Sequence, residues 1–294
     1  MLWVSAPDAQ TADVASHALS WAMAPTDRRW ITRAGDAPAT LLGAALDWLR
    51  GWWFIVHLGA VLLALALSPS SYARPHRPAL LREIYRGSAP GLPWFTLLSS
   101  LAGLVLIRIV TVTAVSYGLT PYALEMVVRV LVLELIPLSA ALFVALRYTL
   151  PQRGAVARLR QQGRIDLQAG AGSAAWQREL LPRVVSGVFA VLTLAAVSCV
   201  VALVITYLSV YGFTPWALES YTRVVGSIFN PSVTLIFMLK TLGFSVTVAL
   251  IPVASAVYDA PQRRSPASAE LHALVRMFAL LLVIEGISLM GNYA

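Results

Sequence analysis

Four ionisable residues interrupt long apolar segments of the sequence: Arg108, Glu134, Lys240 and Glu285. In a bilayer a charge costs on the order of 3 kcal/mol, so such residues usually face the interior of a helix bundle and pair. At about 1.5 Å per residue, each lies roughly 9–20 Å from the same end of its predicted helix. We therefore expect one charged layer. Its pairing is either purely structural or part of a polar patch that lines a cavity, beside a helix loosened by Pro137.

Enzymatic chemistry finds little support in the sequence. It contains no GxxxxGK[ST] phosphate-binding loop, no HExxH zinc motif and no GxSxG nucleophile motif. The four histidines (His17, His57, His76 and His272) lack the spacing of metal ligands, and the single cysteine, Cys199, cannot form a disulfide framework. We expect no catalytic residue, metal site or cofactor in this chain.

The composition indicates a membrane protein. Of 294 residues, 58% are hydrophobic and 12% are charged, whereas soluble globular proteins carry about 25% charged residues. The net charge of +8 comes from 21 Arg and one Lys; the positive-inside rule explains it better than nucleic-acid binding does. The apolar segments are too long for barrel strands. The predicted fold class is therefore an all-α polytopic membrane protein.

Five membrane spans are predicted, preceded by one interfacial helix. The spans cover about 92–116, 122–147, 184–210, 232–257 and 272–291. Segment 41–68 carries Asp47, Arg50 and a cluster of Trp residues, which indicates an interfacial or re-entrant helix, with a true span as the alternative. Residues 1–40 form a polar extension. The Arg-rich loops place the N-terminus in the cytoplasm and the C-terminus outside.

One phrase occurs twice, as YGLTPYALE at 117–125 and YGFTPWALE at 211–219. Including the residues immediately after it, ten of 21 aligned positions are identical. Gly118 and Gly212 suit the end of a helix, and the prolines three residues later suit the start of the next. The repeat favours an internal duplication of a helix hairpin at the outer surface. Two independent turns are the alternative.

The segments after the two copies differ from each other. After the first phrase, the helix is predicted to run directly into the membrane. After the second, Trp216, Tyr221, Val224 and Ile228 recur at helical spacing, which predicts a short interfacial helix. Asn230 is then expected to cap the fourth span.

Several segments resemble, in order, the MlaE family, the permease subunits of bacterial ABC lipid transporters that work with MCE proteins. They are RPALLREIYRGS (77–88), LVLELIPLSAALFVALR (131–147), PRVVSGVFAVLTL (182–194), IFMLKTLGFSVTVALI (236–251) and ALVRMFALLLVIEGISLM (273–290). Glu134 matches the Glu of the family's RELGP motif, and Lys240 matches the Lys of its LIKS motif. Glu285 stands where the family usually has Asp.

The resemblance implies a permease domain over residues 41–294 in the bacterial inner membrane. It further implies a second permease subunit (a second copy or a paralogue), a cytoplasmic ABC ATPase that carries ATP and Mg, and a periplasmic MCE protein. A phospholipid or related lipid would bind in an outward-facing pocket. The candidate lipid contacts are Arg108, Tyr117, Glu134, Lys240 and Glu285.

One loop departs from the family pattern. Related permeases have an acidic coupling helix after the second span, whereas loop 148–181 carries Arg158, Arg160 and Arg164. We expect these arginines to govern contact with the ATPase, because charge reversal changes the partner or abolishes coupling. The alternatives are a non-transporting scaffold or degenerate permease, and a secondary transporter that couples ions through Glu134 and Lys240.

Overall fold

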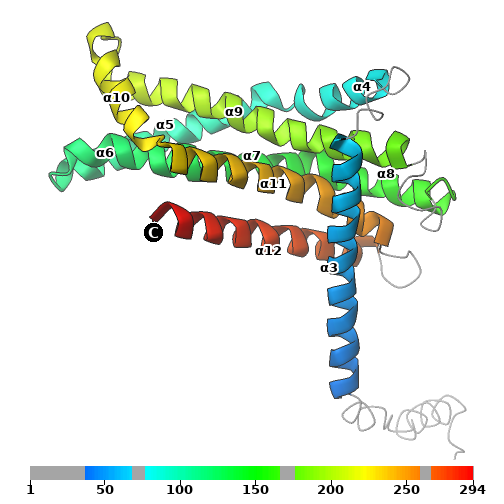
Figure 1. Cartoon of the computed structure of the whole chain (residues 1–294). Helices are drawn as coiled ribbons and strands as arrows, with labels where there is room; N and C mark the ends of the chain where they lie inside the picture. The colour runs from blue at the N-terminus through cyan, green and yellow to red at the C-terminus, as the bar shows by residue number, and fades with distance from the viewer. Residues whose placement is uncertain (1–36, 68–76, 166–175, 259–265, 294) are drawn as a thin grey trace, which may run out of the picture. The chain divides into compact units, whose positions relative to one another are not determined.

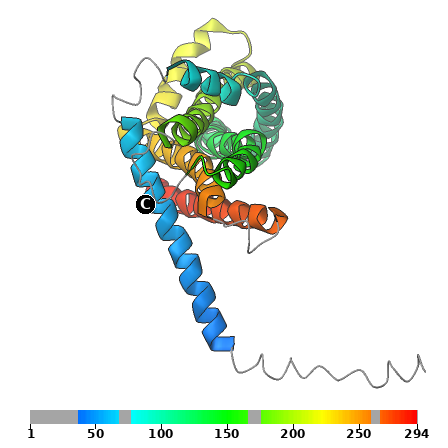
Figure 2. The ribbon, with the colours of Figure 1, turned by 90° about the vertical axis from the view of Figure 1, so that its right-hand side faces the viewer.

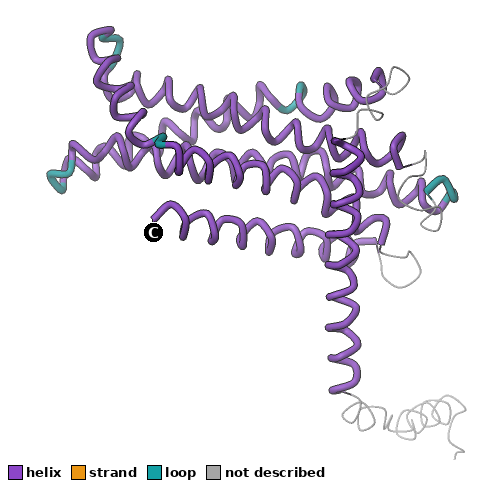
Figure 3. The backbone as a smooth tube through the Cα atoms, viewed as in Figure 1, coloured by secondary structure: helices purple, strands orange, loops and turns teal. Residues whose placement is uncertain are grey.

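The computed structural model describes residues 37–67, 77–165, 176–258 and 266–293. These segments are almost entirely helical and contain no strand, as Figure 3 shows, so the all-α prediction is confirmed. The chain divides into two units, Met1–Arg50 and Gly51–Ala294. Most of the predicted polar extension, 1–40, lies outside the described residues.

The helices succeed one another with short connections. In chain order they are α3 (Ala37–Leu67), α4 (Arg77–Ser88), α5 (Leu92–Ser116), α6 (Thr120–Val127), α7 (Ile136–Val144), α8 (Leu150–Gln161), α9 (Leu181–Tyr211), α10 (Leu218–Ile228), α11 (Pro231–Tyr258) and α12 (Pro266–Tyr293). Three π-helical segments, η2 (Val128–Leu135), η3 (Ala145–Thr149) and η4 (Trp176–Leu180), join or precede α-helices, and η5 (Pro215–Ala217) is a 3₁₀ turn.

Six helical segments among the described residues are long and apolar enough to cross a membrane. Five of them contain the five predicted spans, and the sixth is Leu49–Ala66 in α3. The Gly51–Leu67 part of α3 runs across α11 and α12 rather than alongside them (Figures 1 and 2). Its Ile55, Leu58 and Leu62 are buried at helical spacing against the core.

The second predicted span extends further than expected. The sequence predicts an end near Arg147 and a polar loop beyond it, but the helix continues to Gln161 through η2, α7, η3 and α8. Each π-helical segment ends two residues before a proline: Pro137, Pro151 or Pro182. Proline lacks an N–H, and its ring clashes with the carbonyl four residues earlier. The wider π turn accommodates that clash without ending the helix.

Both copies of the repeated phrase lie at the same end of the helices, beside α6 and α10 (Figure 1). Gly118 and Gly212 have φ angles of 71° and 68°, the left-handed conformation that favours glycine. Each phrase leads into an ion pair between residues four apart. The distances are 2.9 Å for Glu125–Arg129 and 3.0 Å for Glu219–Arg223. The two copies of the phrase therefore share a positive-φ glycine and a following ion pair.

The predicted difference between the two copies is also confirmed. The second phrase leads into η5 and α10, and Tyr221 and Ile228 of α10 are buried. Asn230 caps α11, since its Oδ1 accepts the N–H of Val233 at 2.8 Å. Trp216 was predicted on the apolar face of this helix, but it is 91% exposed because η5 turns the chain before α10 begins.

Candidate functional site

Lys240 of α11 brings two carboxylates together. Its Nζ contacts Glu134 Oε2 from η2 and lies 2.9 Å from Glu285 Oε2 of α12. The Lys240 side chain is 1% exposed, whereas those of Glu134 and Glu285 are 14% and 17% exposed. The ammonium also lies 5.7 Å from the ring centroid of Phe244. Three of the four predicted intramembrane charges therefore form one layer, as the cost of burying them requires.

The proline after Glu134 adds a backbone acceptor to this layer. In an α-helix the N–H at position 137 would bond to the Leu133 carbonyl, but Pro137 has none. Lys240 Nζ lies 3.4 Å from that carbonyl oxygen. The π-helical turn η2 and the proline thus offer Lys240 a neutral oxygen in addition to the two carboxylates.

The charged layer lies between two apolar clusters. On the side of the repeated phrases, the cluster includes Leu131, Ile136, Cys199, Tyr221 and Val233. On the other side, it includes Ala140, Leu194, Phe244, Val248 and Leu281. Along α11, Lys240 separates Val233 of the first cluster from Phe244 of the second. The ion pairs thus sit at the junction of the two clusters, where η2, α11 and α12 meet.

The layer carries an excess of acceptors. When all three groups are ionised, two carboxylates and one ammonium sum to −1. In a medium of low dielectric constant, such an excess favours a proton, a cation or a hydrogen-bond donor beside the carboxylates. The carboxylates are also the more exposed members. Ser288 lies one turn from Glu285, and its buried hydroxyl has no hydrogen-bond partner within the described residues.

Two predicted site residues do not join this layer. Arg108 projects from an exposed position on α5, and it has no ion pair or hydrogen bond within the described parts of the chain. Tyr117, the residue after α5, is 76% exposed at the end where the repeated phrases lie. The expectation of a four-charge layer therefore holds for three charges only.

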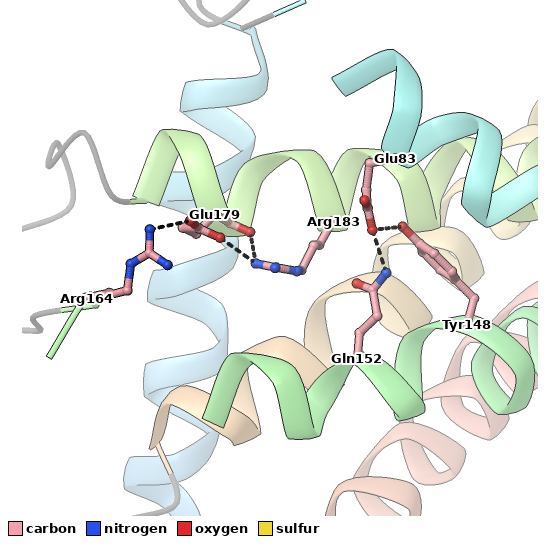
Figure 4. Close-up of polar contacts among 6 residues, drawn as sticks. All are labelled: Glu83, Tyr148, Gln152, Arg164, Glu179 and Arg183. Carbon is pink, nitrogen blue, oxygen red and sulfur yellow. Dashed lines mark hydrogen bonds and ion pairs between the residues drawn. The ribbon is translucent and has the colours of Figure 1, made fainter. Parts of the chain in front are cut away.

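A second polar cluster, which was not predicted from the sequence, joins α4 to α8, at the end of the helices opposite α6 and α10 (Figure 1); Figure 4 shows its side chains. Glu83 Oε1 of α4 accepts hydrogen bonds from the Tyr148 hydroxyl at 3.0 Å and from Gln152 Nε2 at 2.8 Å. Ser186 Oγ of α9 lies 2.8 Å from the Tyr148 hydroxyl and donates to the Glu83 carbonyl at 2.7 Å. Glu83 thus ties α4 to η3, α8 and α9. No short-range pattern indicates it, because its partners are 65–103 residues away.

The three arginines predicted to contact a partner lie on α8 or just beyond it. Arg158 is exposed and Arg160 is half-buried. Arg164 lies 3.7 Å from Glu179, whose other carboxylate oxygen lies 3.3 Å from Arg183 (Figure 4). Arg158 and Arg164 are both exposed, and Arg158 has no ion pair within the described residues.

Comparison with known proteins identifies a family. Residues 80–290 match the family model described as Permease MlaE, and this range contains the Lys240 layer, the Glu83 cluster and α8. No curated protein matches the chain. The match covers well over half of the chain, and six helices among the described residues are long and apolar enough to cross a membrane, so this multi-pass membrane protein belongs to the MlaE permease family.

Proposed function

We propose that this chain is the permease subunit of an ABC-type transporter that moves a phospholipid or related lipid. The lipid would pass between the bacterial inner membrane and a periplasmic MCE-type partner, and a separate cytoplasmic ATPase would supply the energy. Family membership supports the transporter class. The observation that carries the site is the Lys240 layer, which keeps two partly exposed carboxylates between two apolar clusters of the helix bundle.

In this proposal Lys240 positions the carboxylates, and the carboxylates meet the lipid. The ammonium is too buried to touch a passing headgroup, while Glu134 and Glu285 retain exposed surface. Headgroup ammonium or hydroxyl groups would donate to the spare carboxylate oxygens, and the Ser288 hydroxyl would add one more polar contact. Tyr117 would meet the lipid at the outer end.

Coupling to the ATPase would use the long helix between Thr120 and Gln161. Glu134 and Arg158 are 24 residues apart on this helix, which corresponds to roughly 36 Å. A partner bound at α8 would therefore act directly on the element that carries Glu134. The π-helical segments η2 and η3 are the points at which this helix would adjust. The α8 end would face the cytoplasm and the repeated phrases the periplasm.

The test is purification of the full chain with its native partners in lipid nanodiscs, combined with mass spectrometry of proteins and lipids. We expect an ATPase and at least one phospholipid to co-purify, and Glu134→Gln to reduce bound lipid several-fold without loss of the ATPase. Glu219→Gln is the matched control, because that carboxylate belongs to an exposed ion pair. A preparation that contains neither ATPase nor lipid would contradict the proposal.

The excess carboxylate favours one second candidate, an ion-coupled secondary transporter. Buried carboxylates beside a lysine are typical of proton and cation relays in such proteins. The two candidates differ in energy source. In proteoliposomes, lipid movement that depends on a proton or sodium gradient and ignores ATP would favour the secondary transporter.

A further inference from the structure

The outward face of α5 is apolar apart from Arg108. The large exposed residues around it are Leu101, Leu104, Val105, Ile109, Val112 and Val115. Arg108 lies eight residues before the end of α5 at Ser116, or about 12 Å along the axis. The 25-residue helix is about 37 Å long, against about 30 Å of hydrocarbon in a bilayer. The Arg108 side chain therefore starts within the hydrocarbon layer.

A guanidinium at this depth needs an anionic partner. Arginine does not lose its proton in proteins, so it cannot escape the cost of burial by becoming neutral. The described parts of this chain supply no partner to Arg108. Glu134 and Glu285 contact Lys240, and Glu125 pairs with Arg129. The neutralising group must therefore come from outside these residues.

A second copy of the chain does not supply that group through the same face. In a symmetric dimer with its axis along the membrane normal, an α5–α5 contact places equivalent residues together. Arg108 would then face Arg108 of the second copy, and like charges in hydrocarbon repel strongly. A lipid phosphate is also a poor match. Arginines that reach the lipid phosphates by snorkelling typically lie near a helix end, whereas Arg108 lies about two turns from the end of α5.

We propose that this face of α5 binds a transmembrane helix of another protein that carries an Asp or Glu at the depth of Arg108. The flanking leucine and valine side chains would pack against the apolar surface of that helix, and Arg108 would form a bidentate pair with its carboxylate. The charge pair would fix the depth and orientation of the bound helix. This surface is separate from the Lys240 layer, and its role does not depend on lipid transport.

The test is site-specific photocrosslinking of the full chain in its native membranes. A photoreactive residue replaces Val105 or Val112, which flank Arg108 by about one turn, and the adducts are mapped by peptide mass spectrometry. We expect a protein adduct on an apolar helix that contains Asp or Glu. Arg108→Leu should lower its yield at least tenfold, and Arg108→Lys should retain part of it, because the ammonium keeps the charge but not the bidentate geometry. A probe at Val204, exposed on α9, is the control and should be indifferent to both changes.

A charge exchange completes the experiment. Arg108→Glu should abolish the adduct, and replacement of the mapped carboxylate by Arg in the partner should restore it. Adducts with lipid alone, adducts with α5 of a second copy, or a protein adduct that persists in Arg108→Leu would each overturn the proposal. Two controls separate this result from misfolding. A misfolded Arg108→Glu variant would not regain the adduct when the partner's carboxylate is replaced by Arg. The melting temperature of the Arg108→Leu variant alone should be unchanged or higher.

Discussion

At the scale of single residues, the central feature is the dependence of two carboxylates on one lysine. Lys240 is almost fully buried and contacts both Glu134 and Glu285. A buried ion pair contributes little to stability when it is complete, but removal of one partner is costly, because the remaining charge is left without compensation. Removal of Lys240 therefore leaves two carboxylates without a cation, whereas removal of either glutamate leaves Lys240 with one carboxylate.

Lys240→Met should be the most damaging substitution of the three. It leaves two neighbouring carboxylates without a cation, and we expect a loss of about 3–5 kcal/mol. Glu134→Gln should be milder, because Lys240 keeps its contact with Glu285 at 2.9 Å. Thermal unfolding in detergent, with Glu219→Gln as an exposed control, measures this order. Equal melting temperatures for Lys240→Met and the control would contradict it.

The sequence reveals these residues through the cost of burying charge, which holds in any apolar segment. The sequence predicts how deep each charged residue lies along its helix, but not toward which side of the helix its side chain points. For Arg108 the direction is decisive, and α5 is apolar on all sides, so no periodicity indicates which face is outward. Glu83 escapes prediction for another reason: it lies in a basic segment that looks solvated, while its partners come from distant helices.

At the scale of helices, small residues and wide turns determine how closely the elements approach. A Cβ at Gly187 of α9 would lie 2.9 Å from Ala249 Cβ of α11 and 3.3 Å from Ala249 Cα. Without a hydrophobic driving force between helices, such close contacts hold a membrane bundle together. The packing between α9 and α11 in turn places Lys240 opposite η2.

Gly187→Val should therefore destabilise the protein by about 1–3 kcal/mol through overpacking. Gly226→Ala in α10 is the matched control, because nothing lies within 4 Å of the added Cβ. That change should be neutral or should stabilise the helix by up to about 1 kcal/mol. Melting curves of the two variants give the comparison, and a Gly187→Val variant as stable as the wild type would show that this interface is loosely packed.

Tyr221 tests whether α10 is docked against α9. Burial, with a smaller effect of Tyr211, raises the pKa of Tyr221 from 10.0 to about 12, and its hydroxyl donates to the Leu203 carbonyl at 2.8 Å. A raised pKa means that this contribution to stability is complete below pH 10 and is lost as the pH rises through 12. When tyrosine ionisation is followed by ultraviolet absorbance, the Tyr221→Phe variant should lack one phenol that ionises near pH 12 in the wild type. If the missing phenol ionises near pH 10 instead, α10 is not docked.

The sequence predicts the helices well and some of their ends poorly. Long apolar segments and the Asn230 cap are predictable from local chemistry, which acts within a few residues. The extension to Gln161 is not, because Pro151 normally indicates a helix start and here sits behind the wide turn η3. The exposure of Trp216 likewise depends on the 3₁₀ turn before α10.

At the scale of the whole molecule, the charged layer lies between the two apolar clusters of the core. One long helix, from Thr120 to Gln161, connects this layer to α8. The helix from Thr120 to Gln161 contributes Glu134 to the layer, Tyr148 and Gln152 to the Glu83 cluster, and Arg158 to an exposed surface. These positions suit a permease in which a partner at α8 changes the surroundings of Glu134. Membership in the MlaE permease family gives that arrangement a transport role to test.

The most direct measurement is ATP-dependent phospholipid transfer in proteoliposomes that contain this chain with its co-purified partners. We predict transfer that requires ATP, falls at least tenfold in Lys240→Met and is unchanged in Glu219→Gln, whose carboxylate lies in an exposed pair. Western blots must show equal amounts of assembled complex in all samples. Transfer at the same rate in Lys240→Met, or ATP hydrolysis with no lipid movement in the wild type, would contradict the proposed role of the Lys240 layer.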